Sequence, residues 1–394
     1  MKIAIIGCGF VADFYVNNSR HYPNAEIVGG FDLDQQRSAA FCKHFQLREY
    51  QSREELLADA SIELVLNLTN PRAHFEVTKA CLESGKHVYT EKPLAMNVAD
   101  AEILAQIAKE NGVRLACAPC SILSDTAQTV WKAIHTGVIG QIRMVYANYD
   151  DGMIAPMMSP WTWTSESGAA WPAKDEFEIG CTFEHAGYFL AWLVAFFGPV
   201  RNVSAFASCQ IEDKGIAVES MAPDFSVGCL EFDNDIVARV TCGLVAPQDK
   251  SLTVVGDDGV LIVPYLRNDR ETVYLRKTKI QGNRARAENY LNKSQRYFGW
   301  ILDRLPWPVQ AFALHEKYPF ARNTKFINAA PGKPVDFMSG PVDLVNATKE
   351  ERPHRLGADL GIHMVELINE LQFPTESKYK VKTTIEPIQP LPWN

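Results

Sequence analysis

Short apolar runs alternate with amphipathic stretches along the first 120 residues of the chain. Runs rich in β-branched residues are typical of strands buried on both faces, whereas apolar residues three and four apart are typical of helices. The sequence predicts strands at residues 2–6, 25–31, 62–68, 87–90 and 113–118. It predicts helices at residues 11–20, 34–45, 52–59, 73–84 and 99–110. This alternation indicates an α/β domain on a doubly wound parallel sheet, with ligands bound where its strands end.

A different pattern follows residue 122. Helices are predicted at residues 124–135, 180–198 and 356–371, with a long loop at 150–178 and a Pro-rich, extended tail. Strands, some joined by hairpin turns, are predicted at residues 141–148, 202–210, 225–232, 236–242, 251–255 and 259–263. The change of pattern predicts a first domain at residues 1–122 and a second at 123–394.

Composition and charge exclude several classes of protein. The 394 residues are 47% hydrophobic and 22% charged, which is enough to bury a large core. A net charge of −8 gives no reason to expect nucleic acid as a partner, and no apolar run is long enough for a transmembrane helix. Nine scattered cysteines without a secretory signal indicate reduced thiols and a cytoplasmic location. Cys117 and Cys120 form the only close pair, so we expect no metal site.

The first predicted strand runs directly into a G-x-G-x-x-A turn that opens a helix. In such a turn, Gly7 permits the tight bend and Gly9 lets the backbone approach a pyrophosphate. Phe10 and Val11 follow, and the small Ala12 lets the helix pack close to the strand. The phosphates would accept hydrogen bonds from free N–H groups at the helix N-terminus. The turn therefore predicts a dinucleotide site.

The second predicted strand ends at an acidic residue, Asp32, which lies 23 residues after Gly9. A carboxylate at this distance can accept the ribose hydroxyls of adenosine and repels a 2′-phosphate, so NAD is favoured over NADP. Arg37 lies close enough in sequence to weaken that preference. A second interpretation, compatible with the first, makes Asp32 the N-cap of the following helix.

Candidate site residues also follow the ends of two later strands: Thr69, Asn70, Pro71, Glu91 and Lys92. An ammonium held beside Pro93 could hydrogen-bond a substrate hydroxyl and stabilise the alkoxide that develops as hydride leaves. Glu91 could orient Lys92 or form a surface ion pair. The alternative for Lys92 is a solvated surface residue.

Together these motifs carry a family resemblance. The glycine turn, Thr69-Asn70-Pro71 with His74, and the string GKHVYTEKPL at residues 85–94 resemble the Gfo/Idh/MocA oxidoreductases. The resemblance implies an N-terminal Rossmann domain and a C-terminal α+β domain whose open, largely antiparallel sheet forms the substrate wall. It also implies that these residues bind the cofactor, that Lys92 contacts substrate, and that the Lys92–Pro93 bond is often cis.

The apolar helix at residues 180–198 carries the candidate proton acceptor. Tyr188 stands where most members of the resembled family have His, and Glu184 stands in place of their usual Asp. Glu184, His185 and Tyr188 can share one side of the helix. A positive charge at Lys92 would lower the pKa of Tyr188, whereas His185 would titrate near neutral pH unaided. The acceptor is therefore Tyr188, His185 or neither, with Glu184 capping the helix or holding Lys92 or His185.

Two further stretches are candidates for substrate contact. The loop at 150–178 carries Trp161, Trp163 and Trp171, which could stack on sugar rings or cover the sheet or a subunit contact. The segment at 267–325 holds 13 Lys and Arg against 5 Asp and Glu, with many aromatic residues. It could bind an anionic substrate or an acidic surface, or form a subunit interface.

The sequence thus predicts an NAD-dependent oxidoreductase, forming a homo-oligomer (dimer or tetramer). We expect hydride transfer between nicotinamide and a secondary alcohol or ketone of a sugar, cyclitol or sugar derivative, anionic ones included. The main alternative is a redox-neutral enzyme that retains its NAD and oxidises its substrate transiently, for elimination or glycoside cleavage. A third hypothesis is a dinucleotide-sensing regulator or scaffold without turnover.

Overall fold

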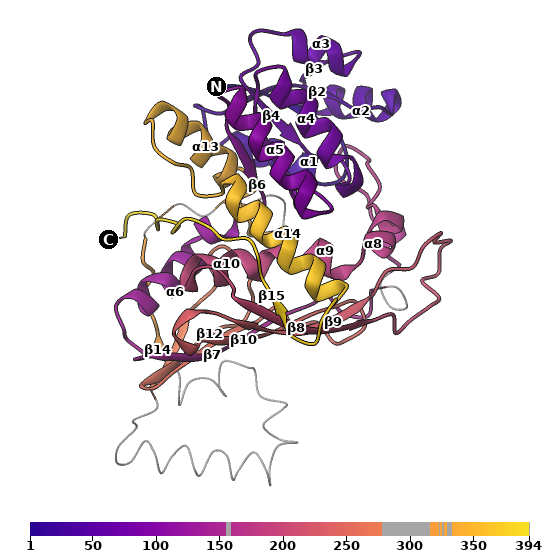
Figure 1. Ribbon diagram of the computed structural model, residues 1–394. Coiled ribbons are helices and arrows are strands. Elements are labelled where there is room, and N and C mark those ends of the chain that lie inside the picture. Colours follow the sequence, from indigo (N-terminus) through magenta and orange to yellow (C-terminus); the bar gives the residue numbers. More distant parts are fainter. Residues whose placement is uncertain (155–158, 278–315, 323, 325–326, 329–332, 394) are drawn as a thin grey trace.

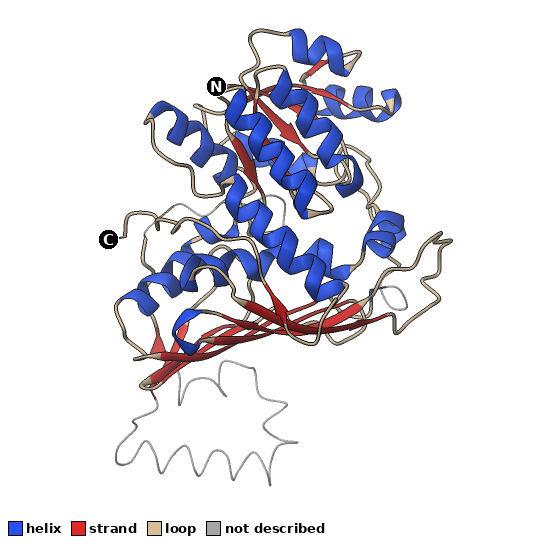
Figure 2. Ribbon diagram, in the orientation of Figure 1, coloured by secondary structure: helices blue, strands red, loops and turns tan. Residues whose placement is uncertain are grey.

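The computed structural model describes residues 1–154, 159–277, 316–322, 324, 327–328 and 333–393 (Figure 1). Within these residues, strands form two sheets, and helices lie on both faces of the first sheet and between the two sheets (Figure 2). The first sheet is the predicted doubly wound parallel sheet, and the second is mixed but mostly antiparallel. The α/β fold class predicted from the sequence is confirmed.

The first sheet contains six strands in the described part of the chain, ordered β3-β2-β1-β4-β5-β6. They are β1 (Lys2–Ile6), β2 (Glu26–Phe31), β3 (Arg48–Glu49), β4 (Leu64–Asn67), β5 (His87–Thr90) and β6 (Leu115–Cys117). Every neighbouring pair is parallel. The order reverses between β1 and β4, so the loops that follow these two strands border the crevice where such sheets bind ligands.

Helices connect these strands close to their predicted positions: α1 (Ala12–Ser19), α2 (Gln35–Phe45), α3 (Arg53–Ala58), α4 (His74–Glu83) and α5 (Val98–Glu110). A short 3₁₀ helix, η1 (Pro71–Ala73), precedes α4. Side chains fix where the helices begin, because Ser52 accepts from the backbone N–H of Glu55 and Asn97 from that of Asp100. Local capping signals thus explain why these predictions are accurate.

The second sheet contains nine strands among the residues described, ordered β14-β13-β12-β11-β7-β10-β9-β8-β15. They are β7 (Ile142–Asp150), β8 (Asn202–Ser208), β9 (Phe225–Glu231), β10 (Val237–Gly243), β11 (Leu252–Gly256), β12 (Gly259–Val263), β13 (Tyr274–Lys277), β14 (Glu316–Lys317) and β15 (Tyr379–Lys380). All neighbours are antiparallel except β7 and β10. The loop after β7 therefore leaves the sheet beside the end of β10.

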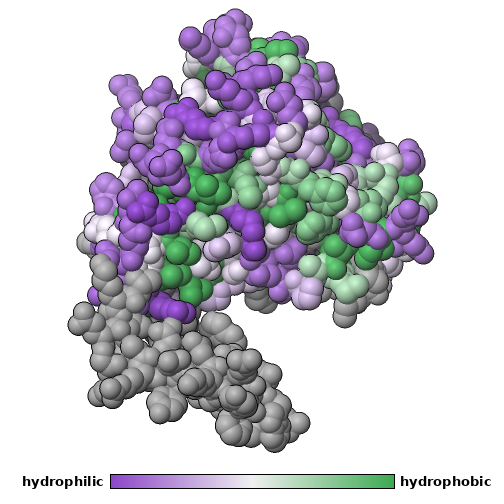
Figure 3. Space-filling view, turned by 60° about the horizontal axis from the view of Figure 1, so that its bottom comes forward, coloured by the Kyte–Doolittle hydropathy of each residue, from purple (hydrophilic) through white to green (hydrophobic). Residues whose placement is uncertain are grey.

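Helices cover the face of this sheet that is turned toward the first sheet (Figure 2). They are α6 (Asp125–His135), α8 (Ala173–Ile179), α9 (Cys181–His185), α10 (Gly187–Phe197) and α14 (Ala358–Gln372). The core beneath them is apolar, and Trp192 of α10 is fully buried with its indole N–H donating to Ser121. On the sheet itself, Phe206 is 58% exposed and Met144 is 39% exposed, and apolar areas interrupt the polar surface in Figure 3.

The C-terminal helices join the two sheets. The helix predicted at 356–371 is α14, which packs against α5, β6 and β8, and the unpredicted α13 (Ser339–Lys349) contacts β5 and β6. The backbone N–H of Cys117 donates to Leu356 O at 3.2 Å. The division after residue 122 stays a prediction, because residues from the end of the chain also pack on the first sheet.

Two sequence predictions for the part of the chain after residue 122 differ from the structure. The loop at 150–178 contains η3 (Pro160–Thr162) and α8, and the helix at 180–198 is divided into α9 and α10. Most of the basic segment, residues 278–315, lies outside the described residues. Its described flanks, β13 and β14, pair antiparallel at one edge of the sheet.

Candidate functional site

The glycine turn has the geometry that a dinucleotide requires. Gly7 has φ +97°, and a Cβ there would lie 2.6 Å from the backbone of both Leu68 and Thr69, so only glycine fits. A Cβ at Gly9 would meet no heavy atom within 4 Å, and the turn therefore presents open backbone on that side. The N-terminal half of α1 follows directly, with Ala12 fully buried. These residues fit a bound pyrophosphate.

Asp32 is held in place at the end of β2. Its two carboxylate oxygens accept the backbone N–H of Cys8 at 2.8 Å and of Asp34 at 2.9 Å. Arg37 Nη1 lies 3.7 Å from Asp32 Oδ2, with 46% of its side chain exposed. Asp34, rather than Asp32, caps α2, because its side chain accepts from the N–H groups of Gln36 and Arg37. The interpretation of Asp32 as N-cap is therefore wrong.

The loop after β4 is fixed by His74, which is completely buried. Its Nδ1 lies 2.6 Å from Pro93 O and its Nε2 lies 3.0 Å from Thr69 O. Burial lowers the pKa of His74. Asn70 accepts from the backbone N–H of Ala73 and so caps η1, which starts at Pro71. His74 therefore links the loop after β4 to the loop after β5. Because it is completely buried, it positions these loops and does not itself contact a ligand.

Lys92 reaches from the end of β5 to the helices of the second domain. Its Nζ lies 2.5 Å from Glu184 Oε2, and the Lys92–Pro93 peptide is cis, as the family resemblance implies. Glu91 accepts from the Lys92 backbone N–H at 3.0 Å and from the Tyr15 hydroxyl at 2.8 Å, so it fixes this loop from inside. Burial disfavours the ammonium, but Glu184 and the nearby oxygen of Tyr188 outweigh it and raise the pKa of Lys92.

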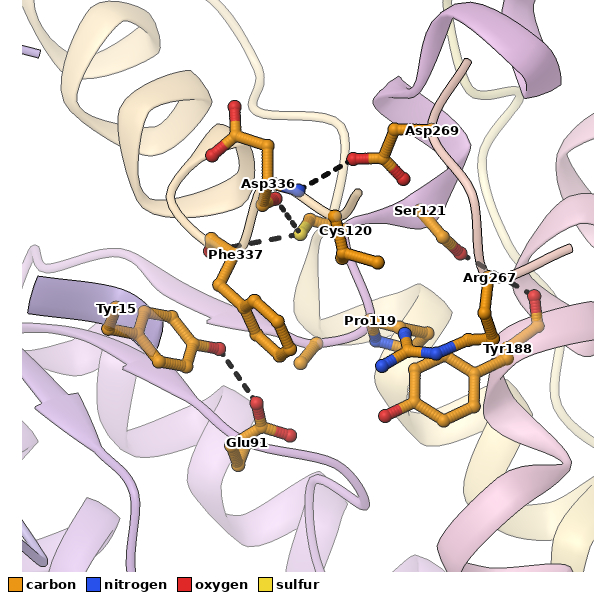
Figure 4. Close-up of a pocket in the computed structure, with 12 residues that line it drawn as sticks. Tyr15, Glu91, Pro119, Cys120, Ser121, Tyr188, Arg267, Asp269, Asp336 and Phe337 are labelled. Atoms are coloured by element: carbon orange, nitrogen blue, oxygen red, sulfur yellow. Dashed lines mark hydrogen bonds between the residues drawn. The ribbon is translucent and has the colours of Figure 1, made fainter. Parts of the chain in front are cut away.

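A pocket lies where the end of the first sheet meets residues of the later part of the chain, and it is lined by Glu91, the neighbour of Lys92, but not by Lys92 itself (Figure 4). Tyr15 and Glu91 line it from the first domain, Tyr188 and Arg267 from the second, and Phe337 from the segment before α13. In Figure 4 the Tyr188 hydroxyl and the Arg267 guanidinium point from one side into the space bounded by Glu91 and Phe337 on the other. The arrangement places a proton-carrying oxygen and a cation on one wall of the pocket.

Tyr188 remains protonated in this environment. Burial raises its pKa, and this effect outweighs the positive charges of Arg267 and Lys92, which lower it. The guanidinium carbon of Arg267 lies 4.0 Å from the centroid of the Tyr188 ring. The expectation that Lys92 would bring the pKa of Tyr188 below its ordinary value is therefore wrong, because desolvation of the buried phenol dominates.

His185 lies among acidic residues instead of in the pocket wall. Its Nε2 is 3.3 Å from Asp151 Oδ2 and 3.2 Å from Glu176 Oε1, and the ring of Tyr149 stacks on both His185 and Tyr188. Burial lowers the pKa of His185 to about 4, despite the opposing effect of Asp151. The expectation that His185 titrates near neutral pH is wrong for the same reason of desolvation.

The three tryptophans of the long loop do not line the pocket formed by the described residues. Trp161 packs on Gly215, where a Cβ would lie 2.7 Å from its ring, and Trp163 and Trp171 form an edge contact at 5.5 Å. The same loop contacts the first domain, because the backbone N–H and hydroxyl of Ser167 donate to the buried Asp13 at 2.7 and 2.8 Å. Asp13 follows the glycine turn directly, so the loop closes against the cofactor side of the molecule.

The sequence missed Arg267 as a site residue, apart from marking it as the start of the basic segment. Tyr15 and Phe337 were also missed, and no local pattern indicates that residues so far apart in sequence meet. The short spacing between a predicted strand end and Arg267 is the only sequence signal that could have drawn attention to it. Among the described residues, no cluster could hold a metal ion and no helix could span a membrane.

A G-x-G-x-x-A turn that follows the first strand of a parallel sheet is typical of dinucleotide-dependent oxidoreductases. Residues 1–118 match the model of an oxidoreductase family with an NAD-binding Rossmann fold, GFO_IDH_MocA. Residues 127–262 match the GFO/IDH/MocA C-terminal domain. The chain belongs to the Gfo/Idh/MocA oxidoreductase family.

Two relatives are identical to this chain at about a quarter of the residues that align. An uncharacterized oxidoreductase from Synechocystis sp. is 23% identical over 272 residues, 67% of this chain and 71% of the relative. The scyllo-inositol 2-dehydrogenase (NADP(+)) IolW from Bacillus subtilis is 24% identical over 217 residues, 54% of this chain and 56% of the relative. The match thus spans little more than half of the inositol dehydrogenase.

Solved structures share the whole fold. An oxidoreductase from Agrobacterium radiobacter, in complex with NAD+, L-tartaric acid and magnesium, has a TM-score of 0.73 at 13% identity, covering 97% of this chain and 98% of its own. An aldose-aldose oxidoreductase from Caulobacter crescentus has a TM-score of 0.69 at 16% identity, covering 96% of this chain and 99% of its own. At these identities the likeness establishes the architecture alone.

Proposed function

We propose that this protein is an NAD-dependent oxidoreductase that interconverts a secondary alcohol and a ketone of a sugar, cyclitol or sugar derivative. The observation that carries the proposal is the contact between Lys92 and Glu184 beside Tyr188, where the first parallel sheet meets the second domain. The relatives that act on inositol and aldoses support this substrate class.

The residues of the glycine turn would hold the pyrophosphate, and Asp32 would accept the adenosine ribose hydroxyls. When bound, the nicotinamide supplies a hydride or accepts one. The negative charge of Asp32 supports NAD over NADP, whereas Arg37 at 3.7 Å offers a partner to a 2′-phosphate. We assign NAD as the preferred cofactor, because the carboxylate is held rigidly by two backbone N–H groups and the arginine is half exposed.

The side chains divide the chemistry between them. The Lys92 ammonium has three donors, of which Glu184 takes one, so it can donate to the substrate oxygen and stabilise developing negative charge. Tyr188 keeps its proton and can donate it to the oxygen of a ketone as hydride arrives. In the direction of oxidation, Tyr188 must first lose its proton, and the positive charges of Arg267 and Lys92 favour the tyrosinate that then accepts the proton of the alcohol.

His185 is the competing proton acceptor. It is neutral at pH 7, and its Nδ1 is buried without a hydrogen-bond partner among the described residues. Its contacts with Asp151 and Glu176 direct it away from the pocket, so we favour Tyr188.

A redox-neutral enzyme that retains NAD is the second candidate. The hydrogen bonds from Ser167 to Asp13 hold a loop of the second domain against α1, next to the glycine turn. A loop anchored there would slow the release of a bound dinucleotide.

The experiment that tests the function is a substrate screen followed by NADH absorbance at 340 nm. Sugars, cyclitols and sugar acids are offered with NAD, and product is quantified against NADH. Equal amounts of free NADH and oxidised product support the dehydrogenase. Product without free NADH supports the redox-neutral enzyme, and no turnover of any substrate contradicts both.

A further inference from the structure

In the proposed chemistry, Arg267 acts only as a positive charge near Tyr188, and a lysine could supply that charge equally well. It lies between β12 and β13, and its guanidinium carbon is 4.0 Å from the Tyr188 ring centroid and 5.8 Å from that of Phe337. Figure 4 shows the guanidinium laid over the Tyr188 ring, across the pocket from Glu91. A cation is thus held at the point where the substrate would meet the proton-carrying hydroxyl.

This guanidinium has no carboxylate partner within 4.0 Å and no hydrogen-bond acceptor anywhere in the described chain. Other arginines show the ordinary arrangement, because Arg201 binds Asp233 through two donors at 2.9 and 2.7 Å. Asp269, two residues further on, accepts instead from the backbone N–H of Asp336. Five donors in a fixed fork therefore face the pocket without an acceptor, which is unfavourable unless a ligand supplies one.

We infer that Arg267 binds a carboxylate of the substrate, so that the preferred substrates are sugar acids or other acidic sugar derivatives. The inference rests on the proposed function, since it names the substrate class of the same site. A planar carboxylate matches the fork of a guanidinium through two parallel hydrogen bonds. Lys92 is already paired with Glu184, so Arg267 is the cation of the pocket lining whose donors remain available to an anion.

A second nearby cation belongs to the other side of the crevice. Lys333 Nζ lies 4.1 Å from the ring centroid of Phe14 and 5.2 Å from that of Phe10, which is part of the glycine turn. These contacts place Lys333 toward the glycine turn, whereas the guanidinium of Arg267 lies against the Tyr188 ring. Glu91, Asp269 and Asp336 also line the pocket, so a phosphate dianion would meet more repulsion there than a carboxylate, which favours a carboxylate over a phosphate ester.

Calorimetry with the NADH-loaded full chain tests this binding directly. The probes are hexuronates, the matched hexoses and the matched hexose 6-phosphates, which share a ring and differ at one substituent. In the wild-type protein we expect hexuronates to bind at least tenfold tighter than hexoses. In Arg267→Gln we expect this ratio of affinities to fall at least tenfold. Arg267→Lys keeps the charge without the fork and should retain part of the ratio.

Arg270→Gln is the matched control. Arg270 lies three residues further on and pairs with Asp125 at 3.5 Å, and it does not line the pocket. This variant should keep the full preference for hexuronates. Thermal unfolding and NADH binding verify that each variant is folded, so a lost preference cannot be confused with a lost fold.

The outcomes separate the two proposals. Tight, Arg267-dependent hexuronate binding without NAD-linked turnover would support the carboxylate site and contradict the proposed function. Turnover of neutral sugars with equal binding of all three classes would support the function and overturn the carboxylate site. A preference for phosphates, or a hexuronate preference unchanged in Arg267→Gln, would overturn it too. An arginine that served only to stabilise the tyrosinate would give equal binding of the three classes.

Discussion

At the scale of single residues, the proposed preference for NAD depends on Asp32. Both of its oxygens accept backbone N–H groups, and Arg37 approaches one of them. The carboxylate therefore stays where a 2′-phosphate would have to lie, and its charge opposes the phosphate.

Asp32→Asn should reduce the preference for NAD over NADP at least tenfold. The substitution keeps the shape but removes the repulsion, and it frees Arg37 to pair with the 2′-phosphate. Calorimetric affinities for both cofactors measure the ratio. Asp34→Asn, which removes the same charge two residues on, is the control. A wild-type protein that binds NADP more tightly than NAD would contradict the assignment.

A second residue-scale effect concerns stability. His363 of α14 is fully buried, its Nε2 accepts from the Val200 backbone N–H at 3.0 Å, and its Nδ1 lies 2.8 Å from Thr383 Oγ1. Burial lowers its pKa to about 4, although Glu366 opposes the shift. In the unfolded chain the His363 imidazole has its ordinary pKa near 6.5. As the pH falls, the unfolded state therefore takes up this proton before the folded state does. The stability from the neutral ring is present above pH 6.5 and is lost as the pH drops toward 4.

We therefore expect the free energy of unfolding to fall between pH 7 and 5, with about 2 kcal/mol of the fall due to His363. Urea denaturation at both pH values measures it. His363→Gln, which can retain both hydrogen bonds without titrating, should show a fall smaller by about that amount. An equal fall in the variant would show that His363 does not carry the effect.

At the scale of elements, the glycine turn joins fold and function. The two glycines differ, because a Cβ at Gly7 would strike the backbone of Leu68 and Thr69, whereas a Cβ at Gly9 would point into open space. One glycine is thus required by the fold, and the other is required only by a bound phosphate.

Gly7→Ala should lower both stability and cofactor affinity, because its φ is positive and its Cβ has no room. Gly9→Ala should change the free energy of unfolding by less than about 1 kcal/mol and weaken NAD binding at least tenfold. Urea denaturation and NAD calorimetry on both variants test the distinction. A Gly9→Ala protein with unchanged affinity would show that the pyrophosphate does not bind against this backbone.

The elements of the first sheet were predictable because their signals are local. Ser52 and Asn97 cap their helices, and apolar runs mark β1 and β4. The two-residue strands β3 and β15 were missed, since each exists only through its partner, as when Tyr379 pairs with Val203. Arg48 of β3 likewise pairs with Gly29, so neither pairing can be recognised from the two residues of the strand and their immediate neighbours.

At the scale of the whole molecule, the site is assembled from distant parts of the chain. The proposed residues Lys92, Glu184 and Tyr188 could be named from the sequence because two motifs carry them, and the structure brings Lys92 and Glu184 into contact. Arg267 and Phe337 were not found, because only the folded chain brings them to Tyr188. The pKa values of Tyr188 and His185 were mispredicted for a related reason, since sequence shows charges but not burial.

The basic segment offers a prediction about assembly. Residues 278–315 leave from β13 and return through β14, which are paired neighbours, so a short turn can replace them. We expect the shortened protein to fold, to bind NAD with unchanged affinity, and to form a smaller oligomer than the full chain. Sedimentation equilibrium and calorimetry measure these properties. If the shortened protein forms an oligomer of the same number of subunits and has the same KM for its substrate, residues 278–315 are neither a subunit interface nor an anion site.

The central claim is that Lys92 and Tyr188 act together on the chemical step. Tyr188→Phe keeps the ring that stacks on Tyr149 and removes only the oxygen that carries the proton. Lys92→Ala removes the ammonium that polarises the substrate oxygen. Because the two residues act as a unit, the double variant should lose less activity than the product of the single losses.

The most direct measurement is the kcat of Tyr188→Phe, with NAD affinity measured on the same preparation and His185→Ala as the control. A general acid–base group contributes about 100- to 10,000-fold, so kcat should fall within that range while NAD affinity changes less than about threefold. His185→Ala should retain most of its kcat. A Tyr188→Phe enzyme that keeps its kcat, with the loss in His185→Ala instead, would contradict the account.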